Sequence, residues 1–98
     1  MDMSVGLRDK NTSDVEMLLV EFKFNMGNPN NLSHVDMRGK VAGSISVLGP
    51  TRAIHNEYIF IFQSNLTQQA RSRMARMIPV IPATYIAMSI DELRTKFF

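Results

Sequence analysis

The chain has no cysteine and no tryptophan, and no apolar run approaches the length of a membrane-spanning helix. Without cysteine, a disulfide framework and a thiolate metal site are excluded. The absence of long apolar runs and of a leader-like N-terminus predicts a cytoplasmic chain with no membrane partner. Charge imbalance is also small, because 11 basic and 9 acidic residues leave a formal net charge of +2. That charge by itself identifies no polyanionic partner.

The 98 residues, 45% of them hydrophobic and 20% charged, predict one globular domain over residues 1–98, with residues 1–4 outside the ordered part. Eight methionines are many for this length. Because the thioether side chain is flexible, methionines can fill irregular gaps in a core or form a soft interaction surface. Core filling is the prediction here, since most of them stand in register with other apolar residues.

The strongest strand signal runs from Val15 to Phe24. Side chains alternate between the two faces of a strand, and both faces of this one are mostly apolar, which is typical of a strand buried on both sides. Glu21 and Lys23 share one face near its far end. An unpaired buried charge is costly, so this end of the strand needs a partner or a function.

The remaining pattern predicts alternating helices and strands. In chain order the expected elements are a weak strand at 5–9, the strand at 15–24, a helix at 33–48, a strand at 57–62, a helix at 64–77, a strand at 84–88 and a helix at 89–98. Ser33 and Ser89 are the expected N-caps of the first and last helices. The order β-β-α-β-α-β-α predicts an α/β domain in which crossover helices pack on a small mixed β-sheet.

Asp9, Glu21 and Lys23 are the residues predicted to carry chemistry. If 5–9 pairs with 15–24, Asp9 is expected beside Glu21 across the hairpin. Two carboxylates facing one point form a site for Mg²⁺ or Mn²⁺, which prefer oxygen ligands and keep several waters, and the backbone carbonyl of Phe22 is a further expected ligand. Lys23 would then help to activate a metal-bound water or stabilise charge on a phosphate.

An acidic residue in a hairpin, then Glu-x-Lys at the end of an apolar strand, then helix, strand, helix and strand, resembles the PD-(D/E)xK nuclease-like superfamily. This group includes type II restriction enzymes, archaeal Holliday-junction resolvases and many repair nucleases. Its motif corresponds here to Asp9, eleven intervening residues and Glu21-Phe22-Lys23, within a resemblance that covers residues 5 to 90. The resemblance implies a restriction-endonuclease-like core, two metal-binding acids, a lysine that assists the attacking water, and hydrolysis of phosphodiester bonds in DNA.

The sequence departs from that pattern in two ways. Arg8 stands where the proline of the family name precedes the first acid. The family core begins with a helix and a strand ahead of the hairpin, whereas eight residues precede Asp9 here, which predicts a truncated or minimal version or a fold completed by a second copy. Asp14 competes for the role of first acid, but it stands on the same strand as Glu21, roughly 20 Å away when extended.

The helix expected at 64–77 is basic, with Arg71, Arg73 and Arg76 and no acid between Ser64 and Pro79. Such a helix is suited to following a DNA phosphate backbone, and Gln69 is a candidate for further contacts to sugar, phosphate or base edges. The alternative is a solvated helix face whose long side chains cover apolar surface.

A simpler interpretation has Glu21 and Lys23 emerging at a sheet edge, solvated or paired with other charges. The chain is then a non-catalytic α/β interaction or nucleic-acid-binding module that self-associates. A homo-oligomer, dimeric or higher, is expected under either interpretation, because small domains often complete a core by self-association. His34 and His55 have no partner at metal-ligand spacing, so neither is expected to be catalytic.

Overall fold

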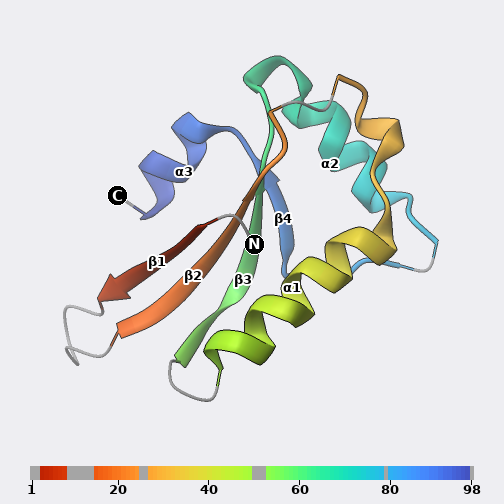
Figure 1. The fold of residues 1–98 in the computed structure, drawn as a ribbon. Helices are drawn as coiled ribbons and strands as arrows, with labels where there is room; N and C mark the ends of the chain where they lie inside the picture. Colours follow the sequence, from red (N-terminus) through yellow and green to blue (C-terminus); the bar gives the residue numbers. More distant parts are fainter. Residues whose placement is uncertain (1–2, 9–14, 25–26, 50–52, 79, 98) are drawn as a thin grey trace.

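A computed structural model describes residues 3–8, 15–24, 27–49, 53–78 and 80–97 of the chain. The elements follow the predicted order (Figure 1): β1 (Met3–Arg8), β2 (Val15–Phe22), η1 (Pro29–Asn31), α1 (His34–Leu48), β3 (Ala53–Ile61), η2 (Ser64–Leu66), α2 (Thr67–Ala75), β4 (Tyr85–Met88) and α3 (Ile90–Phe97). The fold is therefore an α/β fold with a four-stranded mixed sheet and three helices in the described part of the chain.

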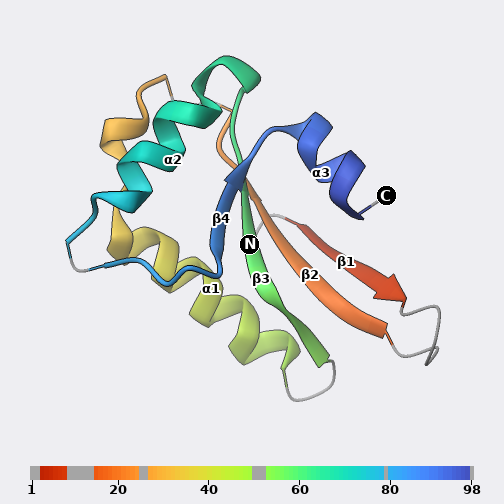
Figure 2. The same cartoon turned by 180° about the vertical axis from the view of Figure 1, so that it is seen from behind.

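The four strands lie side by side in the order β1-β2-β3-β4 (Figure 2). β1 is antiparallel to β2, whereas β2, β3 and β4 are parallel to one another. The carboxyl ends of the three parallel strands therefore meet at one edge of the sheet. The amino end of β1 lies at that same edge, because Met3 is opposite Val20 while Arg8 is opposite Val15.

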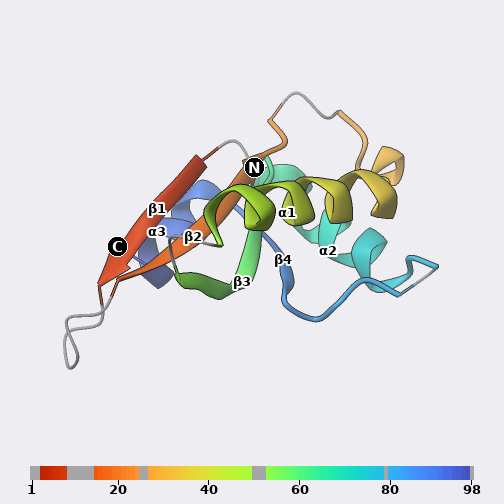
Figure 3. The same cartoon turned by 60° about the horizontal axis from the view of Figure 1, so that its bottom comes forward.

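Helices cover both faces of the sheet, with α1 and α2 on one face and α3 on the other (Figure 3). Phe60 of β3 and Phe62 just after it pack with residues of α1 and α2, and Ile59 and Ile61 pack with Leu93 of α3. Each fully buried side chain of this size stabilises the fold by roughly 1.5–3 kcal/mol. The alternation of β2 gives it two buried faces, as predicted, since both Leu18 and Leu19 are fully buried.

Methionines fill the core as predicted. Met37 and Met74 are buried between the sheet and the helices α1 and α2, and Met88 is buried on the face that α3 covers. Met77 is also buried in the first of these clusters, just beyond the end of α2. A flexible thioether suits such positions at the ends of elements, where the gaps between side chains are irregular.

The predicted N-caps of the first and last helices are confirmed. The Ser33 hydroxyl accepts a hydrogen bond from the backbone N–H of Asp36 at 3.3 Å. Ser89 and Glu92 form a reciprocal capping box, in which the Glu92 N–H donates to the Ser89 hydroxyl and the Ser89 N–H donates to the Glu92 carboxylate. These bonds satisfy N–H groups that a helix leaves unpaired at its start.

Several predicted boundaries are wrong; β2, for example, ends at Phe22 rather than at residue 24. Residues 3 and 4, expected outside the ordered part, belong to β1, because they pair with Val20 and Leu19. β3 begins at Ala53 rather than residue 57, since the start of β2 extends the ladder across a register shift between Met17 and Leu19. α2 ends at Ala75 rather than at residue 77.

No helix in the described part of the chain is long and apolar enough to cross a membrane.

Candidate functional site

The candidate site lies where the three parallel strands end. Phe22 is the last residue of β2, and the backbone N–H of Lys23 still donates to the carbonyl of Ile61 at 2.7 Å. This bond holds Glu21 and Lys23 at the carboxyl edge of the sheet. In open α/β sheets, ligands bind in the crevice beyond this edge.

Glu21 is buried on the face of the sheet that α1 covers. Its residue is 2% exposed, and one of its carboxylate oxygens lies 3.6 Å from Nζ of Lys40 on α1. A carboxylate this deep is expensive unless a cation or hydrogen-bond donors compensate it. Lys40 supplies a compensating charge across the interface between β2 and α1.

Lys23 makes a second ion pair to the same helix, with its Nζ 3.2 Å from a carboxylate oxygen of Asp36. Asp36 and Lys40 are four residues apart on α1, so they lie on one face of the helix. The four residues form what we call the edge cluster: Glu21, Lys23, Asp36 and Lys40.

Sequence reasoning missed Asp36 and Lys40 as members of this cluster. No role at this edge of the sheet was predicted from the sequence for either residue. Asp36 and Lys40 are four residues apart, so a helix places both on one face. Their charges are opposite to those of Lys23 and Glu21, and this pattern in the sequence is compatible with two ion pairs between the helix and the strand.

Asp9 lies outside the described residues. Its described neighbour Arg8 is opposite Val15, six residues and about 20 Å along an extended strand from Glu21. The described end of β1 therefore lies away from Glu21, and the placement of Asp9 beside Glu21 stays a prediction. Asp14, the competing acid, also lies outside the described residues.

The described residues fit a Mg²⁺ or Mn²⁺ site in part. Glu21 is a carboxylate of the kind these cations prefer, and such ions often bind through one or two carboxylates while keeping waters. Among the described residues there is no group of three or more His, Cys, Asp or Glu side chains that could hold a metal ion. A second carboxylate from outside those residues is therefore needed for the predicted pair. Phe22, whose carbonyl was the further expected ligand, turns its ring to the face opposite Glu21, where it packs with the α3-side core.

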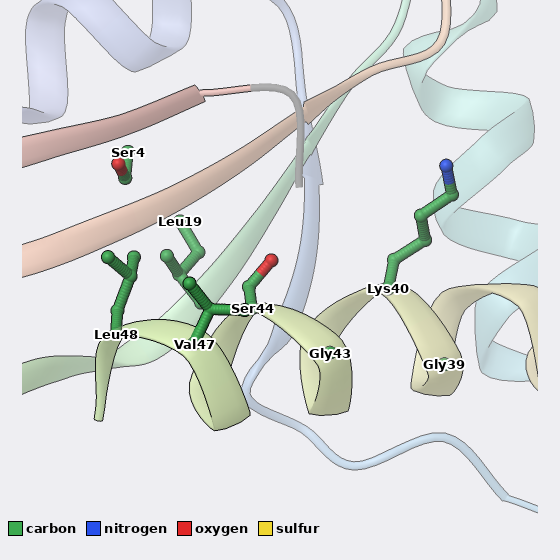
Figure 4. A pocket seen from close by; sticks show the side chains of 8 residues that line it. All are labelled: Ser4, Leu19, Gly39, Lys40, Gly43, Ser44, Val47 and Leu48. Atoms are coloured by element: carbon green, nitrogen blue, oxygen red, sulfur yellow. The ribbon is translucent and has the colours of Figure 1, made fainter. Parts of the chain in front are cut away.

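A groove opens beside the edge cluster, between α1 and the β1–β2 hairpin (Figure 4). Its volume is about 460 Å³, and Lys40 stands at one end of it with Leu48 at the other. Gly39 and Gly43 leave the helix side open, because a Cβ on either would meet no atom within 4 Å. Ligands can therefore approach Lys40 from the groove.

The predicted arginines of α2 point to different neighbours. The side chain of Arg71 donates to the carbonyl of Ala87 at 3.1 Å and pairs with Glu92 of α3, which lowers the pKa of that carboxyl. Arg73 donates to the carbonyl of Leu32 at 3.3 Å, while Arg76, at the end of α2, is exposed. Two of the three arginines thus hold parts of the protein together.

Gln69 contacts the segment that follows β2. Its side-chain amide is 3.5 Å from the amide oxygen of Asn28, in the segment that follows β2. The neighbouring Gln63, just before η2, donates to the carbonyl of Phe24 at 2.6 Å. The start of α2 is therefore tied to the chain that leaves the carboxyl end of β2.

His55, which has no partner in the sequence at metal-ligand spacing, lies between two carboxylates. Its ring nitrogens are 3.0 Å from Glu16 and 3.3 Å from Glu57, and Lys96 of α3 pairs with Glu57 at 3.0 Å. The hydrogen bond from Lys96 is the main cause of a lowered pKa for Glu57. We call these residues the helix-docking cluster: Glu16, His55, Glu57 and Lys96. It joins the amino ends of β2 and β3 to the last turn of α3.

No protein-family model, curated protein or solved structure matches this chain.

Proposed function

We propose that this chain is a metal-dependent nuclease domain with a restriction-endonuclease-like core, which hydrolyses phosphodiester bonds in DNA. The observation that supports this proposal best is the buried carboxylate of Glu21 at the carboxyl edge of the parallel strands. Lys40 of α1 pairs with this carboxylate, and Lys23, two residues further along the chain, pairs with Asp36. Buried charges in such a place are expensive and are more often kept for function than for stability.

The four-stranded sheet supports the same proposal. A hairpin of antiparallel β1 and β2, a crossover helix and a parallel β3 follow one another in the order that the resemblance implies. In that arrangement Glu21 and Lys23 end the second strand of the hairpin.

Each residue has a proposed role. A bound Mg²⁺ or Mn²⁺ would lower the pKa of a coordinated water and stabilise charge on the phosphate. Glu21 would hold the cation. Lys23 is 16% exposed and paired with Asp36, so its ammonium group is well placed to orient the attacking water.

The second carboxylate is a proposal from the sequence, supported by the register of the described residues next to it. Met3 lies opposite Val20, the residue before Glu21. Asp2 precedes Met3 in the sequence and lies outside the described residues. We therefore propose Asp2 as the second acid in preference to Asp9. Substitution of each residue in turn distinguishes these two candidates.

DNA binding is part of the proposal, with Arg76 at the end of α2 and Gln69 within it as the first candidates for contact. Arg76 is exposed, and Gln69 is tied to the segment that leaves β2. Arg71 and Arg73 have protein partners, so neutralising them would disturb the fold as well as any phosphate contact.

Cleavage of plasmid DNA tests the proposal. Wild-type protein is expected to nick or linearise plasmid with Mn²⁺ or Mg²⁺ and to stop when the metal is chelated. Glu21→Gln and Lys23→Ala are expected to lower the rate by about 10²-fold or more. Glu16→Gln is the matched control, because it removes one acid from the exposed start of the same strand.

The same assay decides the second acid. Asp2→Asn is expected to abolish cleavage and Asp9→Asn to leave it within twofold. The reverse result would restore Asp9 to the site. Equal cleavage by wild type and Glu21→Gln, or none by either, would overturn the enzyme proposal.

A non-catalytic module that self-associates is the second candidate. It is favoured by exposed apolar side chains, among them Ile78 at 90% and Val80 at 78% exposure in the segment after α2. Light scattering of the wild type and of Ile78→Ser tests it. A dimer or higher oligomer that the substitution dissociates, together with no cleavage, would favour this candidate.

A further inference from the structure

The segment between α2 and β4 carries the two most exposed large apolar side chains of the described residues. Ile78 is 90% exposed and Val80 is 78% exposed, on either side of residue 79, which lies outside the described part of the chain. Their outer neighbours Met77 and Ile81 are buried in the core. The segment is therefore anchored on both sides, while Ile78 and Val80 face solvent.

An arginine of α1 holds the backbone of this segment. The guanidinium group of Arg38 donates to the carbonyl of Val80 at 2.7 Å. The chain between α2 and β4 lies on the side of the molecule opposite α3 (Figure 1 and Figure 2). The side chain of Val80 thus projects from a backbone that is tied to a helix.

Positive charge without a carboxylate partner accompanies the two apolar side chains. Arg73 and Arg76 stand at the end of α2, and Arg38 contacts the segment from α1. Within the described ranges the ion pairs include Arg71 but none of these three arginines. The hydrogen bonds of Arg38 and Arg73 go to neutral carbonyl groups, which leave the positive charges uncompensated.

This combination fits a DNA duplex better than a second copy of the chain or a lipid surface. A two-fold contact through Ile78 and Val80 would bring the arginines of both copies together, and like charges repel. On a membrane, the two side chains offer roughly half the carbons of a myristoyl chain, which by itself binds only marginally. DNA offers phosphates to the arginines and stacked bases, between which aliphatic side chains can insert.

We propose that Ile78 and Val80 form an apolar wedge that inserts into the base stack of a DNA duplex, held at its phosphates by Arg38, Arg73 and Arg76. The wedge partly unstacks one base step, and the arginines supply an attraction that does not depend on base sequence. The inference takes DNA as the partner from the proposed function, but it does not require cleavage. It adds a surface that deforms the duplex.

Binding to a duplex with one flexible TA step, in the presence of a metal chelator, tests the wedge. A 2-aminopurine base at that step is expected to fluoresce more strongly when wild type binds, because unstacking relieves its quenching. Ile78→Ser combined with Val80→Ser is expected to remove this rise and to weaken binding by about tenfold, with the salt dependence unchanged.

The matched control is Ile78→Leu combined with Val80→Leu, which keeps both side chains apolar and is expected to behave as the wild type. Both positions are exposed, so the serine and leucine variants are expected to keep the melting temperature of the wild type.

Salt dependence tests the arginines separately. Arg76→Gln is expected to lower the slope of log K against log salt concentration by about 0.9, while the bound duplex still shows the 2-aminopurine rise. Arg38→Gln is expected to act in the same way, and Arg38→Lys, which keeps the charge, is expected to restore the slope. Arg94→Gln removes an exposed positive charge from α3 and should leave the slope unchanged.

The outcomes separate this inference from the enzyme proposal. If wild type binds the duplex without a 2-aminopurine rise, or if the serine variant matches it in both readings, the wedge is wrong, whether or not plasmid is cleaved. If wild type binds and unstacks the duplex but does not cleave plasmid, the enzyme proposal fails and the wedge stands.

Two further results would overturn the wedge. One is binding of wild type to vesicles that contain phosphatidylserine, with no binding to the duplex. The other is an oligomer in light scattering that the serine variant dissociates without any change in DNA affinity.

Discussion

Two charged clusters lie at opposite ends of strand β2, and they differ in depth. The edge cluster is centred on Glu21, whose side chain is 3% exposed. The helix-docking cluster is centred on Glu57, whose side chain is 26% exposed, with Glu16 at 53%. Both contain acids and bases within ion-pair distance, but only the first encloses a carboxylate.

The comparison shows how burial separates a docking contact from a candidate site. In the helix-docking cluster the ring of His55 also meets the ring of Phe97 edge-on, with centroids 5.6 Å apart. The ion pairs and the aromatic contact together attach α3 to the sheet. The charged groups also remain partly hydrated, because their side chains are partly exposed. In the edge cluster the carboxylate of Glu21 is almost fully buried. Removal of a partner is therefore expected to lower the free energy of unfolding strongly.

The largest expected difference between the clusters is the coupling between Glu21 and Lys40. In a double-mutant cycle with Glu21→Gln and Lys40→Met, the coupling free energy from urea unfolding is expected to be about 2 kcal/mol. Removal of Lys40 alone leaves a buried charge with one compensating group fewer, whereas removal of both does not. A coupling below about 0.5 kcal/mol would remove the distinction between the two clusters.

A smaller coupling is expected between Glu57 and Lys96. The cycle with Glu57→Gln and Lys96→Met should give about 0.5 kcal/mol, since both side chains retain contact with water. In about 0.5 M salt this value should fall by more, in proportion, than the Glu21–Lys40 value. Hydrogen exchange should show faster exchange in α3 and unchanged exchange in α1. Faster exchange in α1 would show that the two clusters are not independent.

The smallest expected effect concerns acid stability. Lys96, by its hydrogen bond, lowers the pKa of Glu57 from its ordinary value of 4.5. The folded protein then binds fewer protons than the unfolded chain, so this stabilisation is complete above the ordinary value and is lost as the pH falls through the lowered one.

The variant Glu57→Gln tests the direction of this pH dependence of stability. Between about pH 6 and about pH 3, its unfolding free energy should fall less steeply than that of the wild type. An equal or steeper fall would mean that the contact with Lys96 does not act on Glu57 in solution. Glu16→Gln, at the more exposed end of the same cluster, is the control.

Local chemistry in the sequence was sufficient for much of the fold. The apolar alternation of β2 predicted burial on both faces, and the two capping serines set the starts of α1 and α3. The start of β3 was missed because His55 and Asn56 are polar and look like a connector. They belong to the strand because β2 pairs with Ala53 and Ile54 before them and with Tyr58 after them, across a register shift that only the tertiary fold provides.

The candidate site was predictable in part. Glu21 and Lys23 were found from their place on an apolar strand. The expected juxtaposition of Asp9 with Glu21 stays a prediction, because Asp9 lies outside the described residues; its neighbour Arg8 is opposite Val15 at the start of β2.

The sequence by itself determined which segments form strands and helices, because periodicity and capping act over a few residues. It also determined that a glutamate and a lysine end the strongest strand. The tertiary structure alone decided that Lys40 and Asp36 face them, since α1 is positioned by its packing over the sheet. It also decided which arginines of α2 are occupied, because their partners Ala87 and Leu32 are distant in the chain and meet them only when the helices pack.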